Sequence, residues 1–300
     1  MRLQRLFAVT LALALALASP PAPAETPKLP IVASFSVLAD FTRQIGGDKV
    51  EVKALVGPNG DVHVYEPSPA DAQSLAAARL IVMNGLNLEG WMARLIAASG
   101  AKAPVIVASK GVTPREGVIE GEKGVDPHAW QSVANAKIYV ANILAGLIAA
   151  DPANAAYYRA RGKTYDAALD ETDSDVRAAI AAIPPRNRKI ITTHDAFGYF
   201  GAAYGLELIA PQGFSTESEP SARQVAGLIE QIRRERAPAV FLENISDPRL
   251  MERIAQESGA KIGGELFSDS LSPPNGPAGT YIAMMKHNII ELKKALAPDN

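Results

Sequence analysis

The chain has 300 residues, among them 30 lysines and arginines, 32 aspartates and glutamates, and no cysteine. A formal charge of −2 leaves no excess of basic side chains to neutralise phosphates, so we exclude nucleic acid as a partner. The absence of cysteine excludes disulfide bonds and also a thiol to which a lipid could be attached.

The first 24 residues are typical of a secretory signal. Arg2 and Arg5 precede an apolar run from Leu6 to Ala18, and the segment ends in Pro-Ala-Pro-Ala. This run is shorter than the ~20 residues that a membrane-spanning helix needs. We therefore expect residues 1–24 to be a cleaved signal peptide, and the mature protein to be periplasmic without a lipid anchor.

Short apolar, β-branched runs alternate with alanine-rich helical segments in both halves of the chain. We expect strands at residues 31–35, 50–56, 80–83, 105–107, 189–193, 206–209, 239–242 and 260–263. Continuous apolar runs of this length are typical of parallel strands buried on both faces. The sequence therefore predicts an α/β protein with two β/α sandwich lobes, each built on a four-stranded parallel sheet.

One long helical segment separates the two groups of strands. It begins at Asp151 and Pro152 and ends before Pro184 and Pro185. Some thirty residues at 1.5 Å per residue make a rod of roughly 45 Å. We expect an N-terminal lobe at residues 25–150, a rigid linking helix at 151–184 and a C-terminal lobe at 185–300.

Three of the four histidines lie in polar, turn-rich segments. His63 follows a predicted strand, His128 precedes a predicted helix, and His194 comes directly after the predicted strand at 189–193. Open α/β sheets bind their ligands at the carboxyl ends of the strands, and neutral imidazole is the commonest protein ligand for metals. Asp126 is placed to accept a proton from one ring nitrogen of His128, which would leave the other nitrogen for a metal.

A carboxylate from the last part of the chain would complete this set. Asp269 follows the last predicted strand in a loop, and we select it as the fourth ligand. Glu243, Asp247 and Glu265 are competing candidates because they also lie near strand ends. Three imidazoles and one carboxylate form the ligand set of a closed tetrahedral zinc site.

The fourth histidine is treated differently. His287 lies on a predicted amphipathic helix together with Met284 and Ile289, so we expect it to be structural or solvated.

Four motifs in combination resemble the zinc/manganese solute-binding proteins of ABC transporters. They read GDVHVYEPSP at 60–69, DPHAW at 126–130, THDAFGYF at 193–200 and STESEPS at 215–221. The resemblance implies two β/α lobes joined by a long helix, with the metal in the cleft between them. It also implies His63 and His128 as ligands from the first lobe, and His194 and Asp269 from the second.

Two departures from the family pattern concern the metal. Zinc-specific members often carry a histidine-rich loop before the second ligand, whereas residues 112–125 contain no histidine. Manganese members tend to place glutamate where His194 stands, and a third imidazole favours zinc over manganese. We expect high-affinity capture of zinc, with manganese as the second possibility, and delivery to an ABC-type permease in the inner membrane. A periplasmic metallochaperone is a further candidate partner, and we expect a monomer.

Two further classes of function compete with transport. A zinc hydrolase needs an open coordination position, which four protein ligands would fill, and the sequence contains no His-Glu-x-x-His motif. We therefore expect no enzymatic activity. An adhesin or a binder of organic solutes on the same scaffold stays open at this point, because a fold does not determine its ligand.

Overall fold

The structure is a computed structural model that describes residues 27–119 and 122–297. The predicted signal peptide at residues 1–24 lies outside the described residues.

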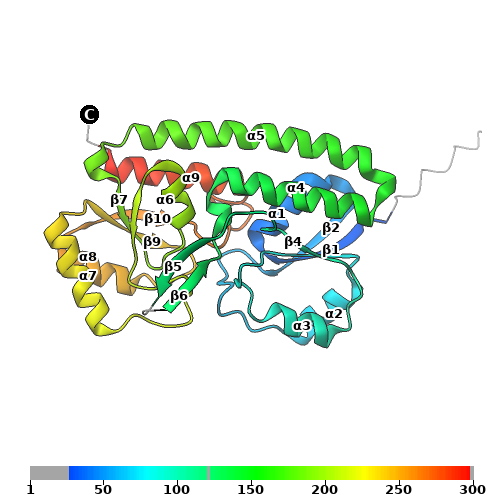
Figure 1. Cartoon of the computed structure of the whole chain (residues 1–300), viewed down its shortest axis with the longest axis horizontal. Coiled ribbons are helices and arrows are strands. Elements are labelled where there is room, and N and C mark those ends of the chain that lie inside the picture. The colour runs from blue at the N-terminus through cyan, green and yellow to red at the C-terminus, as the bar shows by residue number, and fades with distance from the viewer. Residues whose placement is uncertain (1–26, 120–121, 298–300) are drawn as a thin grey trace, which may run out of the picture.

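The first lobe is built on a parallel sheet with strand order β2-β1-β3-β4. Its strands are β1 (Leu29–Phe35), β2 (Val50–Val56), β3 (Leu80–Met83) and β4 (Val105–Val107). The central strands β1 and β3 are almost entirely buried, which explains their continuous apolar sequences. Helices α1 (Ser36–Gly46) and α4 (Val133–Ala150) lie on one side of the sheet, and α2 (Pro69–Ala77) and α3 (Met92–Ser99) lie on the other (Figure 1).

The second lobe repeats this plan with strand order β10-β9-β7-β8, again parallel. Its strands are β7 (Lys189–Ile191), β8 (Glu207–Ile209), β9 (Ala239–Glu243) and β10 (Lys261–Leu266). Its helices are α6 (Gly198–Tyr204), α7 (Ala222–Glu235), α8 (Arg249–Ser258) and α9 (Tyr281–Leu296). The predicted fold, two four-stranded parallel sheets with helices, is thereby confirmed.

A single helix, α5 (Ala155–Ala181), runs along both lobes (Figure 1). Its 27 residues correspond to roughly 40 Å. Short 3-10 turns at Pro152–Asn154 and Pro185–Asn187 flank it. The helix packs against α1 and α4 of the first lobe and α9 of the second, so it is part of the packed structure of both lobes.

Helix α4 (Val133–Ala150) is unusually apolar. Among the described residues it alone is long and apolar enough to cross a membrane, judged by length and composition. In the structure it packs against α1, α5 and β3, and Tyr139, Ile143 and Leu147 are fully buried. Its composition therefore fits its place in the interior of the first lobe.

One hydrophobic core extends through both lobes. It contains Phe35 and Trp130 of the first lobe and Phe200 and Tyr281 of the second. The rings of Phe35 and Trp130 lie 5.0 Å apart. A separate, smaller cluster fills the space between the second sheet and helices α7 and α8. Because the lobes share a core, large independent movements of the lobes would expose apolar surface.

A two-stranded antiparallel hairpin, β5 (Arg115–Ile119) and β6 (Glu122–Asp126), was not predicted. It is formed by a segment whose sequence shows several glycines and charged residues but no strand pattern. The backbone amide of Arg115 donates to Tyr199 Oη at 2.8 Å, and Gly117 lies against Phe214 so closely that a Cβ atom would come within 2.5 Å of the ring. The hairpin thus rests on the second lobe, and this tertiary contact accounts for a pair of strands that lacks an apolar pattern.

Candidate metal centre

The structure brings His63, His128, His194 and Asp269 together at one point between the lobes. One ligand atom from each residue lies within 4.8 Å of all the others. His128, His194 and Asp269 are fully buried, and His63 is only 7% exposed. These are the four residues selected from the sequence, and they come from four separate loops.

The distances between their donor atoms match the edges of a small coordination polyhedron. His63 Nε2 lies 3.0 Å from Asp269 Oδ2, and His194 Nε2 lies 3.1 Å from the same oxygen. His128 Nε2 lies 3.3 Å from His63 Nε2. A tetrahedron with metal–ligand bonds of 2.0–2.1 Å has edges of about 3.3 Å. Three of the separations in the cluster are therefore close to the edge length of such a tetrahedron.

His63 is presented by the loop between β2 and α2. Its backbone amide donates to Asp61 Oδ1 at 2.9 Å, and the indole nitrogen of Trp91 donates to the carbonyl of Val62 at 2.9 Å. At the end of the loop, Ser68 and Asp71 form a capping box that begins α2. The loop is thus fixed on both sides of the imidazole.

His128 follows directly on β6 and is oriented by Asp126. Asp126 Oδ1 lies 2.8 Å from His128 Nδ1 and also accepts the backbone amide of His128 at 3.0 Å. The other carboxylate oxygen accepts from Arg115 Nη1 at 2.9 Å. This arrangement, expected from the sequence, turns Nε2 toward the other ligands.

His194 lies just past β7, and Glu243 lies behind it. Glu243 Oε1 accepts the backbone amides of Thr193 and His194 at 2.7 and 3.0 Å, and its Oε2 lies 2.7 Å from His194 Nδ1. Glu243 was a candidate ligand in the sequence, but the structure places it on the far side of the imidazole.

The two remaining carboxylates near strand ends, Asp247 and Glu265, also lie outside the cluster. Asp247 is exposed and paired with Arg249, and Glu265 is exposed. Asp269 is therefore the carboxylate of the second lobe that faces the imidazoles.

Asp269 follows β10 and presents both carboxylate oxygens to the imidazoles. Oδ2 faces His63 and His194, and Oδ1 lies 3.5 Å from His128 Nε2. Among the described residues, Oδ1 has no hydrogen-bond donor. The carboxylate is therefore able to supply one or two donor atoms to a cation.

Buried carboxylates around the imidazoles favour positive charge in the cluster. Burial lowers the pKa of His128, but the charge of Asp269 and the hydrogen bond to Asp126 outweigh it and raise the pKa to about 9. Burial is likewise outweighed at His194, where Glu243 and Asp269 raise the pKa. Burial raises the pKa of Asp269, but His128 and His194 hold it well below the usual value. These shifts favour protonated imidazoles at His128 and His194 and an ionised carboxylate at Asp269.

The fourth histidine lies outside this cluster. His287 Nε2 lies 3.0 Å from the carbonyl oxygen of Glu265, and its ring packs edge-on against Phe267 at 5.1 Å. Its environment on α9 fits the structural role expected for it.

Sequence reasoning missed three residues that hold the loops of the cluster. Trp91 bonds to the loop of His63, and Gln131 donates to the carbonyl of Ser268 beside Asp269 at 2.7 Å. Trp130 also donates to that carbonyl, at 3.0 Å. The only signal in the sequence is that Trp130 ends the motif of His128 and Gln131 directly follows it.

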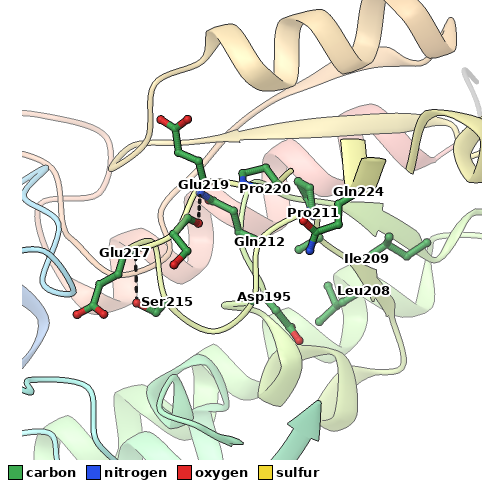
Figure 2. A pocket seen from close by; sticks show the side chains of 13 residues that line it. Asp195, Leu208, Ile209, Pro211, Gln212, Ser215, Glu217, Glu219, Pro220 and Gln224 are labelled. Carbon is green, nitrogen blue, oxygen red and sulfur yellow. Dashed lines mark hydrogen bonds between the residues drawn. The ribbon is translucent and has the colours of Figure 1, made fainter. Parts of the chain in front are cut away.

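One cavity reaches a residue of the cluster. A cavity of about 320 Å³ beside His63 is lined also by Tyr65, Trp91, Arg94 and Glu217, so it connects the most exposed ligand with the surface. Figure 2 shows a second pocket, of about 450 Å³, lined largely by the loop at 211–220. Asp195 lines this second pocket, but none of the four clustered residues does.

Comparison with known proteins places this geometry in a family. Residues 31–295 match the family described as ZnuA, zinc-uptake complex component A, periplasmic. The chain is 34% identical over 277 residues to the manganese ABC transporter substrate-binding lipoprotein PsaA of Streptococcus anginosus, covering 90% of both chains. It is 35% identical over 282 residues to the iron ABC transporter substrate-binding lipoprotein MtsA of Streptococcus pyogenes serotype M1, covering 91% of both. Its structure is similar to the periplasmic zinc binding protein TroA from Treponema pallidum, with a TM-score of 0.86, 32% identity, and coverage of 91% of this chain and 100% of that chain.

The two-lobed fold and these relatives define a class: metal-binding substrate-binding proteins of ABC transporters. The chain belongs to the ZnuA family within that class. It is therefore a transport protein and not an enzyme, and proteins of this class work with a membrane permease and an ATPase. The relatives are named for manganese, iron and zinc, so membership establishes metal binding without naming the metal.

The comparison contradicts one prediction, that of a mature protein without a lipid anchor. Two of the relatives are named lipoproteins. The prediction rested on the absence of cysteine, which excludes a thiol as the point of attachment but does not establish where a protein resides.

Proposed function

We propose that the protein captures zinc through His63, His128, His194 and Asp269 and delivers it to the permease of an ABC transporter. The observation that supports this most directly is the convergence of three buried imidazole Nε2 atoms on one carboxylate, with separations of 3.0–3.5 Å. Each of two imidazoles has a carboxylate behind it, which fixes the ring and raises the basicity of the ligand.

The choice of zinc rests on the donor set. Three nitrogens and a carboxylate suit zinc, whereas manganese prefers carboxylate, carbonyl and water oxygens. Manganese is the second candidate, because Asp269 offers two oxygens and because PsaA is named for manganese. A zinc hydrolase is not favoured, because catalysis needs a positioned acid or base, and the buried carboxylates of Asp126 and Glu243 are both engaged with imidazoles.

We also propose the division of the chain that the sequence predicted: a first lobe at 25–150, the linking helix at 151–184 and a second lobe at 185–300. The contacts of α5 with both lobes favour small rearrangements over wide opening when metal is released. The further partner that we propose is a metallochaperone that donates zinc, and we propose that the chain acts as a monomer.

The test is a metal competition on the full chain. Protein freed of metal by a chelator is titrated calorimetrically with Zn²⁺ and with Mn²⁺, and then with Zn²⁺ in the presence of excess Mn²⁺. We expect one Zn²⁺ per chain, bound more tightly than Mn²⁺. X-ray absorption of the zinc form should show only nitrogen and oxygen neighbours, because the chain has no cysteine. Tighter binding of Mn²⁺ would reverse the assignment of the metal, and zinc binding unchanged in His63→Ala and His128→Ala would overturn the site.

A further inference from the structure

The loop that carries Asp269 belongs to the second lobe in sequence but is bonded to the first lobe. Before Asp269, the carbonyl of Ser268 accepts from both Trp130 Nε1 and Gln131 Nε2, at 3.0 and 2.7 Å. After it, the amide of Leu271 donates to Ser36 Oγ at 2.9 Å. The carbonyl of Leu271 accepts the amide of Asn59 at 3.0 Å.

The second lobe contributes much less to this loop. Pairing with β9 ends at Leu266, so the chain leaves the second sheet before it reaches Asp269. Among the described parts of the chain, and apart from the contact of His194 with the Asp269 carboxylate, the second lobe supplies one hydrogen bond to residues 268–271, from Asn244 Nδ2 to the carbonyl of Ser270 at 3.3 Å. One residue earlier, Asn288 of α9 holds the amide and the carbonyl of Phe267, at 2.9 and 2.8 Å. The backbone on either side of Asp269, at Ser268 and Leu271, is therefore held by first-lobe residues, and the second lobe holds the chain at Phe267 and Ser270.

His194, in contrast, is held by residues of the second lobe. Its amide donates to Glu243, its carbonyl accepts from Thr192 Oγ1, and the neighbouring Thr193 carbonyl accepts from the amide of Gln212. All of these partners belong to the second lobe. The following helix α6 does reach the first lobe, but through the hydroxyl groups of Tyr199 and Tyr204 at the ends of long side chains.

We propose that Trp130 and Gln131 are positioning residues that hold Asp269 on the first lobe. His63, His128 and Asp269 are then three donors attached to the first lobe, and we call these three residues the half-site. The second lobe adds His194 as the fourth donor. This differs from the division of two ligands per lobe that the family resemblance implied. The inference rests on the proposed function, since it assigns roles to the proposed metal ligands.

The consequence concerns loading and release. Because the three donors of the half-site are attached to the same lobe, their positions relative to one another are fixed before the cation arrives. They therefore bind it without a movement of the lobes. Closure of the second lobe brings His194 into place. Release then requires only the displacement of His194, and the shared core and α5 permit such a small movement.

The first test compares the two sides of the Asp269 loop. Gln131→Met keeps the length of the side chain but removes the donor to Ser268, and Asn244→Ala removes the donor to Ser270 from the second lobe. We expect Gln131→Met to weaken Zn²⁺ binding about tenfold or more, as outer partners of ligands do, and Asn244→Ala to change it less than about threefold. Equal effects, or the reverse order, would overturn the inference.

Because Gln131 is fully buried, its replacement needs a check on folding. Urea unfolding of the metal-free forms gives their stability, and Trp130→Phe removes the second donor independently. If Trp130→Phe is folded and binds Zn²⁺ as tightly as the natural chain, the positioning role is excluded.

The second test compares single ligands. We expect His194→Ala to bind one Zn²⁺ with reduced affinity, and added imidazole to restore part of the loss by entering the fourth position. With Co²⁺ as the probe, the visible spectrum of this variant should change as imidazole is added. Asp269→Ala should lose more affinity, and imidazole should not restore it. Equal losses in both variants, or no response to imidazole, would overturn the half-site. A natural chain that fails to bind Zn²⁺ would instead refute the proposed function, so the two failures are distinguishable.

Discussion

Asp126 and His128 form a buried pair in which the carboxylate Oδ1 lies 2.8 Å from the imidazole Nδ1. Asp126 is fully buried, and its second oxygen is neutralised in part by Arg115 at 2.9 Å. The pair fixes the tautomer of the imidazole, because a proton shared with Asp126 leaves the Nε2 lone pair free.

Replacement of Asp126 by asparagine should therefore weaken zinc binding. The amide keeps the shape of the side chain but has no negative charge to support a metal-bound imidazole, and changes of this kind lower affinity roughly 10- to 100-fold. Calorimetric titration measures the effect, with the exposed Glu116→Gln on the same hairpin as the control. If both variants bound zinc like the natural chain, the support of His128 by Asp126 would have no role in binding.

Zinc affinity should rise with pH through the neutral range. The pKa of His128 in the metal-free form is about 9, since Asp269 and Asp126 outweigh the effect of burial. Below that pH a proton occupies the ligand, so binding of one zinc ion releases at least one proton, and affinity rises about tenfold per pH unit for each proton released. Asp269 contributes nothing to this slope near neutrality, because its pKa is lowered and it stays ionised.

Titrations in buffers of different ionisation enthalpy count the released protons directly. We expect at least one per zinc ion at about pH 7. An affinity that stays level between about pH 7 and pH 8.5, with no proton release, would show that the imidazoles of the metal-free centre are already neutral.

His287→Ala should leave zinc binding unchanged. His287 lies on α9, where its side chain contacts Phe267 and the carbonyl of Glu265, and it is not part of the cluster. Any effect should be a small loss of stability of up to about 1 kcal/mol, seen in urea unfolding, because one partly exposed hydrogen bond is removed. The matched change His63→Ala, at the least buried member of the cluster, should abolish tight binding. Equal zinc affinities for these two variants would refute the division of the histidines.

Thr216→Val should speed the dissociation of zinc. Thr216 Oγ1 of the second lobe donates to Asp61 Oδ2 at 2.6 Å, and the other oxygen of Asp61 holds the amide of His63. Loss of one hydrogen bond of about 1 kcal/mol corresponds to a rate increase of roughly fivefold. Stopped-flow chelation measures the rate, and Ser215→Ala is the control, because the Ser215 hydroxyl accepts the amide of Glu217 in its own loop. A rate identical to that of the natural chain would show that this contact between the lobes does not retain the metal.

The amino-acid sequence alone determined the two sheets, the long helix and the segments that carry the three clustered histidines. These features are local: apolar runs such as that of β3 (Leu80–Met83) form strands wherever both faces are buried, and Pro152 and Pro184 mark the ends of a helix through backbone constraints. The sequence also shows where a polar segment directly follows such a strand, as it does at His194.

Only the tertiary structure decided between the carboxylates and which lobe holds each ligand. Glu243 ends β9 and Asp269 follows β10 of the same sheet, and the sequence does not show that Asp269 faces the imidazoles while Glu243 lies behind His194. The contact of the β5–β6 hairpin with Tyr199 and the bonds from Trp130 and Gln131 to Ser268 join segments that are distant in the chain. Such contacts depend on how two lobes pack through a common core, and no local pattern of residues encodes that packing.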